Sequence, residues 1–122
     1  MYYNLYMNEI NNSFLEIKKS KFYGFLYNVS STEDVEIILN KLKDDNKKAR
    51  HIVYAYKIDS LEKSYSDKEP SGTTRSLLDV IKFNNLNNVL IVVIRYFGGT
   101  LLGSGPLTRT YTKVSSMLIN KK

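Results

Sequence analysis

The sequence predicts an α+β protein, a two-layer α/β sandwich in which a four-stranded sheet is backed by helices. Two observations predict this class. Short apolar and aromatic runs typical of strands alternate with segments whose apolar residues recur at helical spacing. The chain has 122 residues, the size of one domain, and no repeat or linker divides it. The expected order of elements is ββαβαβα.

The first two strands are expected to form a hairpin. One apolar-rich segment covers residues 14–17, and residues 22–29 are rich in aromatic and β-branched side chains. The basic run at residues 18–21 lies between them and is placed at the hairpin tip. Residues 1–13 are interpreted as a lead-in to a single domain, residues 14–122.

The strongest helical pattern follows this hairpin. Ser30 and Glu33 have the spacing of a capping box, and acidic residues fill the first turn, as the helix dipole favours. Apolar residues then recur at the spacing of one buried helical face, at Val35, Ile38, Leu39 and Leu42.

The remaining elements are read from shorter patterns. Residues 51–58 predict a strand, and the polar residues 59–74 predict a long loop, of the kind that is usually functional or mobile. Residues 77–81 mark a short helix. The apolar run 89–94 predicts a central strand covered on both faces, and a last helix begins near Leu107.

Composition excludes several classes of protein. There is no cysteine, which excludes disulfides and thiolate metal sites. No window reaches the ~18 consecutive apolar residues of a membrane span, and no targeting segment is recognised. We therefore expect a cytoplasmic protein with no membrane association. The net charge of +6 favours acidic partners such as nucleic acid, although abundant Lys and Asn are also typical of an AT-rich genome.

The most informative segment is the glycine-rich turn between the central strand and the last helix, from Arg95 to Arg109. Such a turn presents free backbone N–H groups and the positive end of a helix dipole, and arginines bracket it. We expect an anion-binding surface; the alternative is that the glycines only allow a tight turn. Neither standard phosphate motif matches, because Pro106 and Leu107 follow Gly105, and Thr108 stands where a dinucleotide motif has glycine.

A second candidate is the loop from Asp67 to Arg75. Asp67 and Glu69 have i, i+2 spacing and can share a face. These carboxylates could bind a cation, act as a base, or cap the next helix.

His51 and the tyrosines are weaker candidates. His51 could act as a base or metal ligand, but a hydrogen-bonded strand-end histidine is the simpler interpretation. The ten tyrosines suggest a stacking surface for single-stranded nucleic acid, with Tyr54 and Tyr56 on one strand face and Tyr23 and Tyr96 as candidate neighbours. Ordinary packing on a half-buried sheet is the alternative.

Three sequence blocks together resemble a known family. They are residues 18–25, residues 49–56 with Asp67 and residues 69–73 after them, and residues 95–105 with Leu107, Arg109 and Tyr111 after them. In order and spacing they are similar to the N-terminal domain of the IMPACT/YigZ family, over nearly the whole chain after residue 13.

The resemblance implies a fold like the second domain of ribosomal protein S-five, a four-stranded sheet backed by helices. Small-molecule kinases share this fold, so the fold alone does not determine the function. Eukaryotic relatives inhibit a translation-controlling eIF-two-alpha kinase by competing for its ribosome-bound activator. Bacterial relatives resemble nucleic-acid or ribosome-associated proteins.

The chain departs from the family pattern in two respects. The family continues Glu-Pro-Ser-Gly-Thr with Ala-Gly-x-Pro, whereas here Thr74-Arg75-Ser76 leads directly into the helix. The ferredoxin-like domain that follows in bacterial relatives, and the RWD domain that precedes in eukaryotic ones, are expected to be absent.

We therefore expect a non-enzymatic binding protein linked to translation, without cofactor or metal, whose partner is RNA, the ribosome, a translation factor or a kinase activator. The alternative is an enzyme on a small phosphorylated substrate, with Asp67 and Glu69 as acid, base or metal ligands. In both cases the two loops are expected to form one site. Its expected residues are Arg95, Tyr96, Gly98, Gly99, Gly103, Gly105, Arg109 and Arg75 for the anion, Asp67, Glu69, Ser71, Gly72 and Thr73 from the second loop, and His51 and Tyr54 in support.

Overall fold

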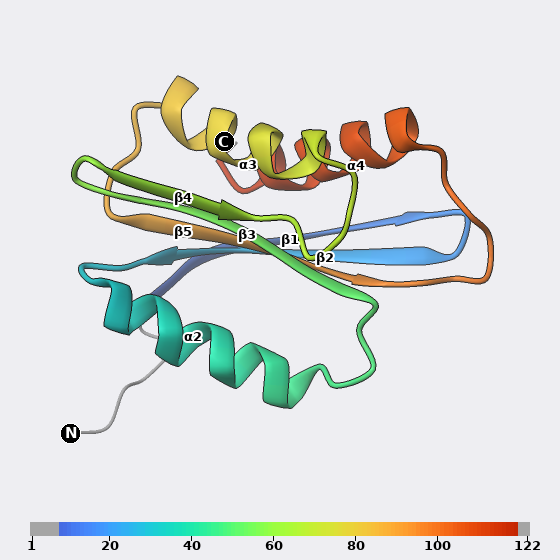
Figure 1. The fold of residues 1–122 in the computed structure, drawn as a ribbon, viewed down its shortest axis with the longest axis horizontal. Helices are drawn as coiled ribbons and strands as arrows, with labels where there is room; N and C mark the ends of the chain where they lie inside the picture. Colours follow the sequence, from blue (N-terminus) through green and yellow to red (C-terminus); the bar gives the residue numbers. More distant parts are fainter. Residues whose placement is uncertain (1–7, 120–122) are drawn as a thin grey trace.

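The computed structural model describes residues 8–119, which form one open antiparallel sheet with helices on both faces (Figure 1). In chain order the elements are β1 (Glu9–Ile17), β2 (Ser20–Asn28), α2 (Thr32–Asp45), β3 (His51–Ile58), β4 (Leu61–Tyr65), α3 (Gly72–Phe83), β5 (Val89–Tyr96) and α4 (Ser104–Met117). The strand order is β1-β2-β5-β3-β4. The predicted α+β class is confirmed.

The sheet has five strands and not the predicted four. The additional strand, β4, lies within the predicted loop 59–74 and pairs with β3. All its residues are exposed, so burial imposes no apolar alternation on this strand, and only its ends, Leu61 and Tyr65, are apolar or aromatic. The sheet also begins earlier than predicted, because residues 9–13 of the expected lead-in belong to β1. The lead-in's first seven residues lie outside the described residues.

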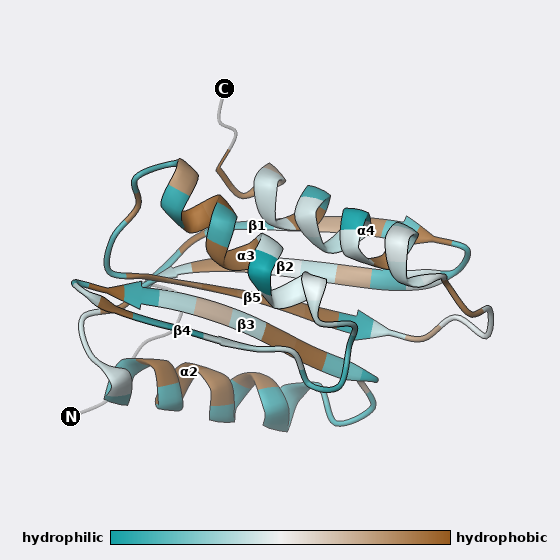
Figure 2. Ribbon diagram, turned by 45° about the horizontal axis from the view of Figure 1, so that its top comes forward, coloured by the Kyte–Doolittle hydropathy of each residue, from teal (hydrophilic) through white to brown (hydrophobic). Residues whose placement is uncertain are grey.

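The helices cover both faces of the sheet, which makes three layers and not two. Figure 1 shows α3 and α4 on one face and α2 on the other. Ile91 and Val93 of β5 pack in the core beneath α3 and α4, whereas Leu90 and Val92 pack in the core beneath α2. Residues 89–95 are all buried, which explains the nearly continuous apolar run of this strand (Figure 2).

The helix α2 buries the predicted face but is capped differently from the prediction. Ser31 is the N-cap, and its Oγ accepts a hydrogen bond from the Asp34 N–H at 3.2 Å. The Asp34 carboxylate accepts in turn from the Ser30 N–H and hydroxyl, both at 2.9 Å. Asp34 therefore takes the place expected for Glu33.

The β1–β2 hairpin has a two-residue turn, Lys18-Lys19, with both residues at positive φ (48° and 71°). These angles match a type I′ turn, whose twist fits the flanking strands. Gly98 of the glycine-rich turn lies against this tip, and its N–H donates to the Ser20 hydroxyl at 3.2 Å. The basic tip and the glycine-rich turn are therefore in direct contact.

Candidate functional site

The two predicted loops meet at the end of β5. The Arg95 Nη1 donates to Glu69 Oε1 and Oε2 at 3.1 and 2.9 Å. Glu69 is 7% exposed and Arg95 5% exposed, so this ion pair is buried. It joins the loop before α3 to the strand from which the glycine-rich turn begins.

Tyr111 of α4 completes this buried cluster. Its hydroxyl donates to Glu69 Oε2, and its ring packs edge-on against Phe22 with centroids 5.4 Å apart. Burial raises the pKa of the Tyr111 phenol well above its ordinary value, and the hydrogen bond to Glu69 and that residue's charge raise it further. The phenol therefore remains protonated and acts as a permanent donor to Glu69.

His51 and Asp67 hold the other side of the loop to β3. The His51 Nδ1 lies 2.6 Å from the Asp67 backbone oxygen, and since a carbonyl only accepts, Nδ1 carries the proton. The His51 Nε2 is 3.6 Å from Glu69 Oε1. The Asp67 carboxylate accepts from the Ile52 N–H at 2.7 Å. His51 is therefore the hydrogen-bonded strand-end histidine considered from the sequence.

These contacts occupy both acidic residues of the second loop. Glu69 accepts from Arg95 and Tyr111, and Asp67 accepts from the backbone of β3. Within residues 8–119 no group of three or more metal-ligating side chains is placed to hold an ion. The hydrogen bonds of Glu69 and Asp67 hold the second loop against β3, β5 and α4.

Arg95 differs most from its expected role. We expected it to present a charge to an external anion, but its guanidinium is buried and paired with Glu69. It lies 5.7 Å from the centroid of the Phe22 ring, and its Nε is buried without a hydrogen-bond partner. Thr73 is likewise buried, and its hydroxyl donates to the Pro70 carbonyl at 2.8 Å.

The outer part of the glycine-rich turn is exposed and lies beside the start of α3. A side chain added at Gly72, the first residue of α3, would contact Thr108 in the second turn of α4, so the N-terminus of α3 lies against α4 near its start. Neither helix has an acidic residue in its first turn. We call the exposed residues here the loop surface: Ser71, Arg75, Gly99, Leu101, Gly103, Gly105 and Arg109.

Tyr96 and Tyr54 do not join the loop surface. Both are partly buried and pack against the core on the α2 face of the sheet. The Tyr96 hydroxyl donates to Asn46 Oδ1 at 2.5 Å, while Tyr54 stacks on Tyr56. Burial raises the pKa of both Tyr96 and Tyr54, and neighbouring tyrosines raise it further. Tyr96, expected among the anion-binding residues, therefore lies apart from the loop surface, and Tyr54 does not support that surface directly.

Comparison with known proteins agrees with this architecture. Residues 18–119 match the Impact N-terminal domain, and the chain belongs to the IMPACT family. It is 38% identical over 102 residues to an IMPACT family member of Haemophilus influenzae, covering 79% of this chain and 50% of that protein. It is 39% identical over 108 residues to IMPACT family member YvyE of Bacillus subtilis, covering 85% and 50%.

A solved structure supports the fold. The chain superposes on a crystal structure described as that of a hypothetical protein with a TM-score of 0.83 and 25% identity, covering 92% of this chain and 59% of that one. The chain thus spans about half the length of the curated relatives it matches. None of the described helices is long and apolar enough to cross a membrane.

Proposed function

We propose that this chain is a binding protein of the translation apparatus that engages ribosomal RNA through the loop surface. The observation that carries the proposal is that two exposed arginines, Arg75 and Arg109, lie near the starts of α3 and α4. The N-terminus of α3 contacts the second turn of α4, and neither helix has an acidic residue in its first turn. Positive helix ends and arginines both favour phosphate. The link to translation comes from the resemblance to the IMPACT family.

The buried cluster supports this proposal by fixing the shape of the loop surface. Glu69 and Arg95 tie the two loops together, and Tyr111 ties them to α4. A surface that is ordered before binding loses less conformational entropy when a partner docks. The cluster therefore acts as a support for binding and not as a contact with the partner.

The enzyme alternative receives less support from the same contacts. A general base needs a free lone pair directed at its substrate. The Glu69 carboxylate accepts from Arg95 and Tyr111, and the Asp67 carboxylate accepts from Ile52. Both carboxylates proposed for acid–base work are thus engaged within the protein.

Co-sedimentation with purified ribosomes tests the proposal. We expect Arg75→Glu/Arg109→Glu to weaken binding at least about tenfold, since charge-assisted phosphate contacts are each worth about 1.5–3 kcal/mol. The matched control, Lys41→Glu/Lys63→Glu, changes the net charge equally at exposed sites on α2 and β4 and is expected to bind nearly as wild type.

Two results would contradict the proposal. One is wild-type binding by the arginine variant. The other is retention of the bound partner after the ribosomal RNA is digested, which would indicate recognition of a protein.

A further inference from the structure

The α2 face of the sheet is covered only in part. Helix α2 packs on β3, β5 and the far end of β2, where Tyr27 is buried. Towards β1, the side chains on the same face of the sheet are exposed: Ile10 is 45% exposed and Phe14 is 44% exposed. Phe14 lies directly opposite Tyr23 of β2 in the strand register, and Phe25 follows two residues later on the same face.

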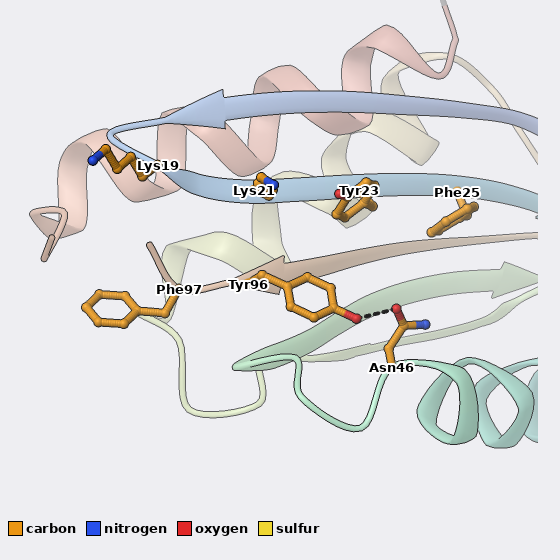
Figure 3. Close-up of a pocket in the computed structure, with 7 residues that line it drawn as sticks. All are labelled: Lys19, Lys21, Tyr23, Phe25, Asn46, Tyr96 and Phe97. Carbon is orange, nitrogen blue, oxygen red and sulfur yellow. Dashed lines mark hydrogen bonds between the residues drawn. The ribbon is translucent and has the colours of Figure 1, made fainter. Parts of the chain in front are cut away.

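A groove lies where this open face meets the end of α2. It has a volume of about 450 Å³. Figure 3 shows Tyr23 and Phe25 along β2, Tyr96 on β5 and Asn46 at the end of α2. Lys19 and Lys21 line the end nearest the hairpin tip. The groove therefore combines an aromatic floor with basic groups at one end.

The aromatic rings of the groove are held in place by one another. The Tyr23 ring centroid is 5.0 Å from that of Phe14 and 6.0 Å, edge-on, from that of Tyr96. The Tyr96 hydroxyl is bonded to Asn46. Rigid aromatic side chains provide contact area at a low entropic cost on binding.

Basic residues continue beyond the groove. A second cavity of about 470 Å³ shares Asn46 with the first and is lined by Lys43 and Lys47. The residues that line the two cavities include four lysines and one acid, Asp67, whose carboxylate is bonded to the Ile52 N–H. Asp44 and Asp45 stand next to Lys43 at the end of α2, where Asp45 pairs with Lys41, and Glu16 lies opposite Lys21 in the register. The lining itself is therefore mainly basic and continues past Asn46.

We propose that this groove binds single-stranded RNA, with bases stacked on Tyr23 and Phe25 and phosphates against Lys19 and Lys21. An aromatic floor next to lysines offers stacking for the bases and charge for the phosphates of a single strand. A duplex keeps its bases stacked inside and gains nothing from the rings. The choice of RNA rests on the proposed link to translation.

Fluorescence anisotropy with a labelled single-stranded RNA of about 12 nucleotides, a length within the usual range for such sites, tests the proposal. Tyr23→Leu/Phe25→Leu removes the rings and keeps apolar bulk. We expect at least about tenfold weaker binding, because each base–aromatic stack is worth about 1–3 kcal/mol. The control Phe83→Leu changes an aromatic side chain on α3 that is 80% exposed, and we expect no change.

A second variant does not depend on the packing of the rings. Lys21 is exposed, so Lys21→Glu is expected to fold normally, to weaken binding and to make its salt dependence shallower. A hairpin RNA of the same composition is expected to bind more weakly than the single strand. Wild-type affinity in the ring variant or in Lys21→Glu, or equal affinity for the hairpin, would overturn the proposal.

The same assay distinguishes binding of the oligonucleotide in the groove from binding at the loop surface. Arg75→Glu/Arg109→Glu is expected to bind the oligonucleotide within about threefold of wild type. The two arginines lie on α3 and α4, on the opposite face of the sheet from the groove (Figure 1), and surface charges separated by more than a Debye length are largely screened. If this variant lost oligonucleotide binding while the groove variants kept it, the strand would bind at the loop surface and the groove proposal would fail.

Discussion

Glu69 is the residue on which the arrangement of the two loops depends. Removing two charges from water costs several kcal/mol for each ion, and this cost is offset only when the pair is well bonded. Here the guanidinium of Arg95 and the hydroxyl of Tyr111 both donate to the Glu69 carboxylate. Loss of one partner would leave the other charge buried without compensation.

We therefore expect Glu69→Ala to lower the free energy of unfolding by about 3–5 kcal/mol, as measured by urea denaturation. Glu62→Ala is the matched control, because Glu62 pairs with Lys82 at the surface and such pairs contribute about 0–1 kcal/mol. The double variant Glu69→Leu/Arg95→Met should recover much of the loss, since no buried charge remains. Equal effects of Glu69→Ala and Glu62→Ala would show that the buried pair is not important for stability.

Because of Tyr111, the free energy of unfolding should depend on pH in the alkaline range. Its pKa is raised in the folded protein above the ordinary value of about 10 that it has in the unfolded chain. The stability from this protonated phenol is fully present below pH ~10 and falls as the pH rises further, by up to about 1.4 kcal/mol per pH unit.

The variant Tyr111→Phe tests this dependence. It should be less stable by about 1–3 kcal/mol at neutral pH, because Glu69 loses a donor. Urea denaturation of both proteins from pH ~8 to ~11 should show the difference shrinking above pH ~10, since Phe does not titrate. A difference that stays constant over this range would mean that the phenol ionises equally in the folded and unfolded protein.

At the scale of elements, the glycine-rich turn owes its conformation to contact with the β1–β2 hairpin. A Cβ atom at Gly98 would lie 2.1 Å from the carbonyl carbon of Lys19. The first glycine of the turn is thus required by close packing, whereas Gly105 lies inside α4 and only faces the flexible side chain of Arg109.

Substitution by alanine should lower the stability of the protein at Gly98 but not at Gly105. We expect Gly98→Ala to destabilise the protein by about 1–3 kcal/mol, because the hairpin backbone must move. Gly105→Ala is the matched control and should leave stability unchanged or raise it by up to about 1 kcal/mol, because alanine favours helix. Thermal unfolding of both variants measures this contrast. Equal shifts would show that Gly98 does not pack against the hairpin as described.

The same elements show what the sequence could and could not predict. Helix α2 was predictable because Val35, Ile38 and Leu42 lie at regular helical spacing and are all buried. The edge strand β4 was not, because all its residues are exposed. The ion pair was also missed, since Glu69 and Arg95 are 26 residues apart and no local pattern relates them.

One signal could have indicated this ion pair. Arg95 directly continues an apolar run that was itself predicted to be buried on both faces. An arginine in such a place needs an acidic partner, because charged side chains are almost never fully buried unless paired. The groove was missed in part: Tyr23 and Tyr96 were named as candidates for stacking, but the sequence did not indicate that they lie beside Lys19 and Lys21.

At the scale of the whole molecule, the two proposed binding surfaces meet at the turn that follows β5. Phe97 lines the groove (Figure 3), while Gly99, Leu101, Gly103 and Gly105 of the same turn belong to the loop surface. The net charge of +6 gives both surfaces a favourable field for a polyanion.

The salt dependence of ribosome binding tests the central claim, that the loop surface contacts phosphates, most directly. Binding of the wild type and of Arg75→Ala/Arg109→Ala would be measured over about 50–200 mM salt, a range in which phosphate contacts change affinity strongly. We expect a steep linear fall of log K with log salt for the wild type, and a slope smaller by about 1 for each arginine removed. Parallel lines for the two proteins would contradict this claim.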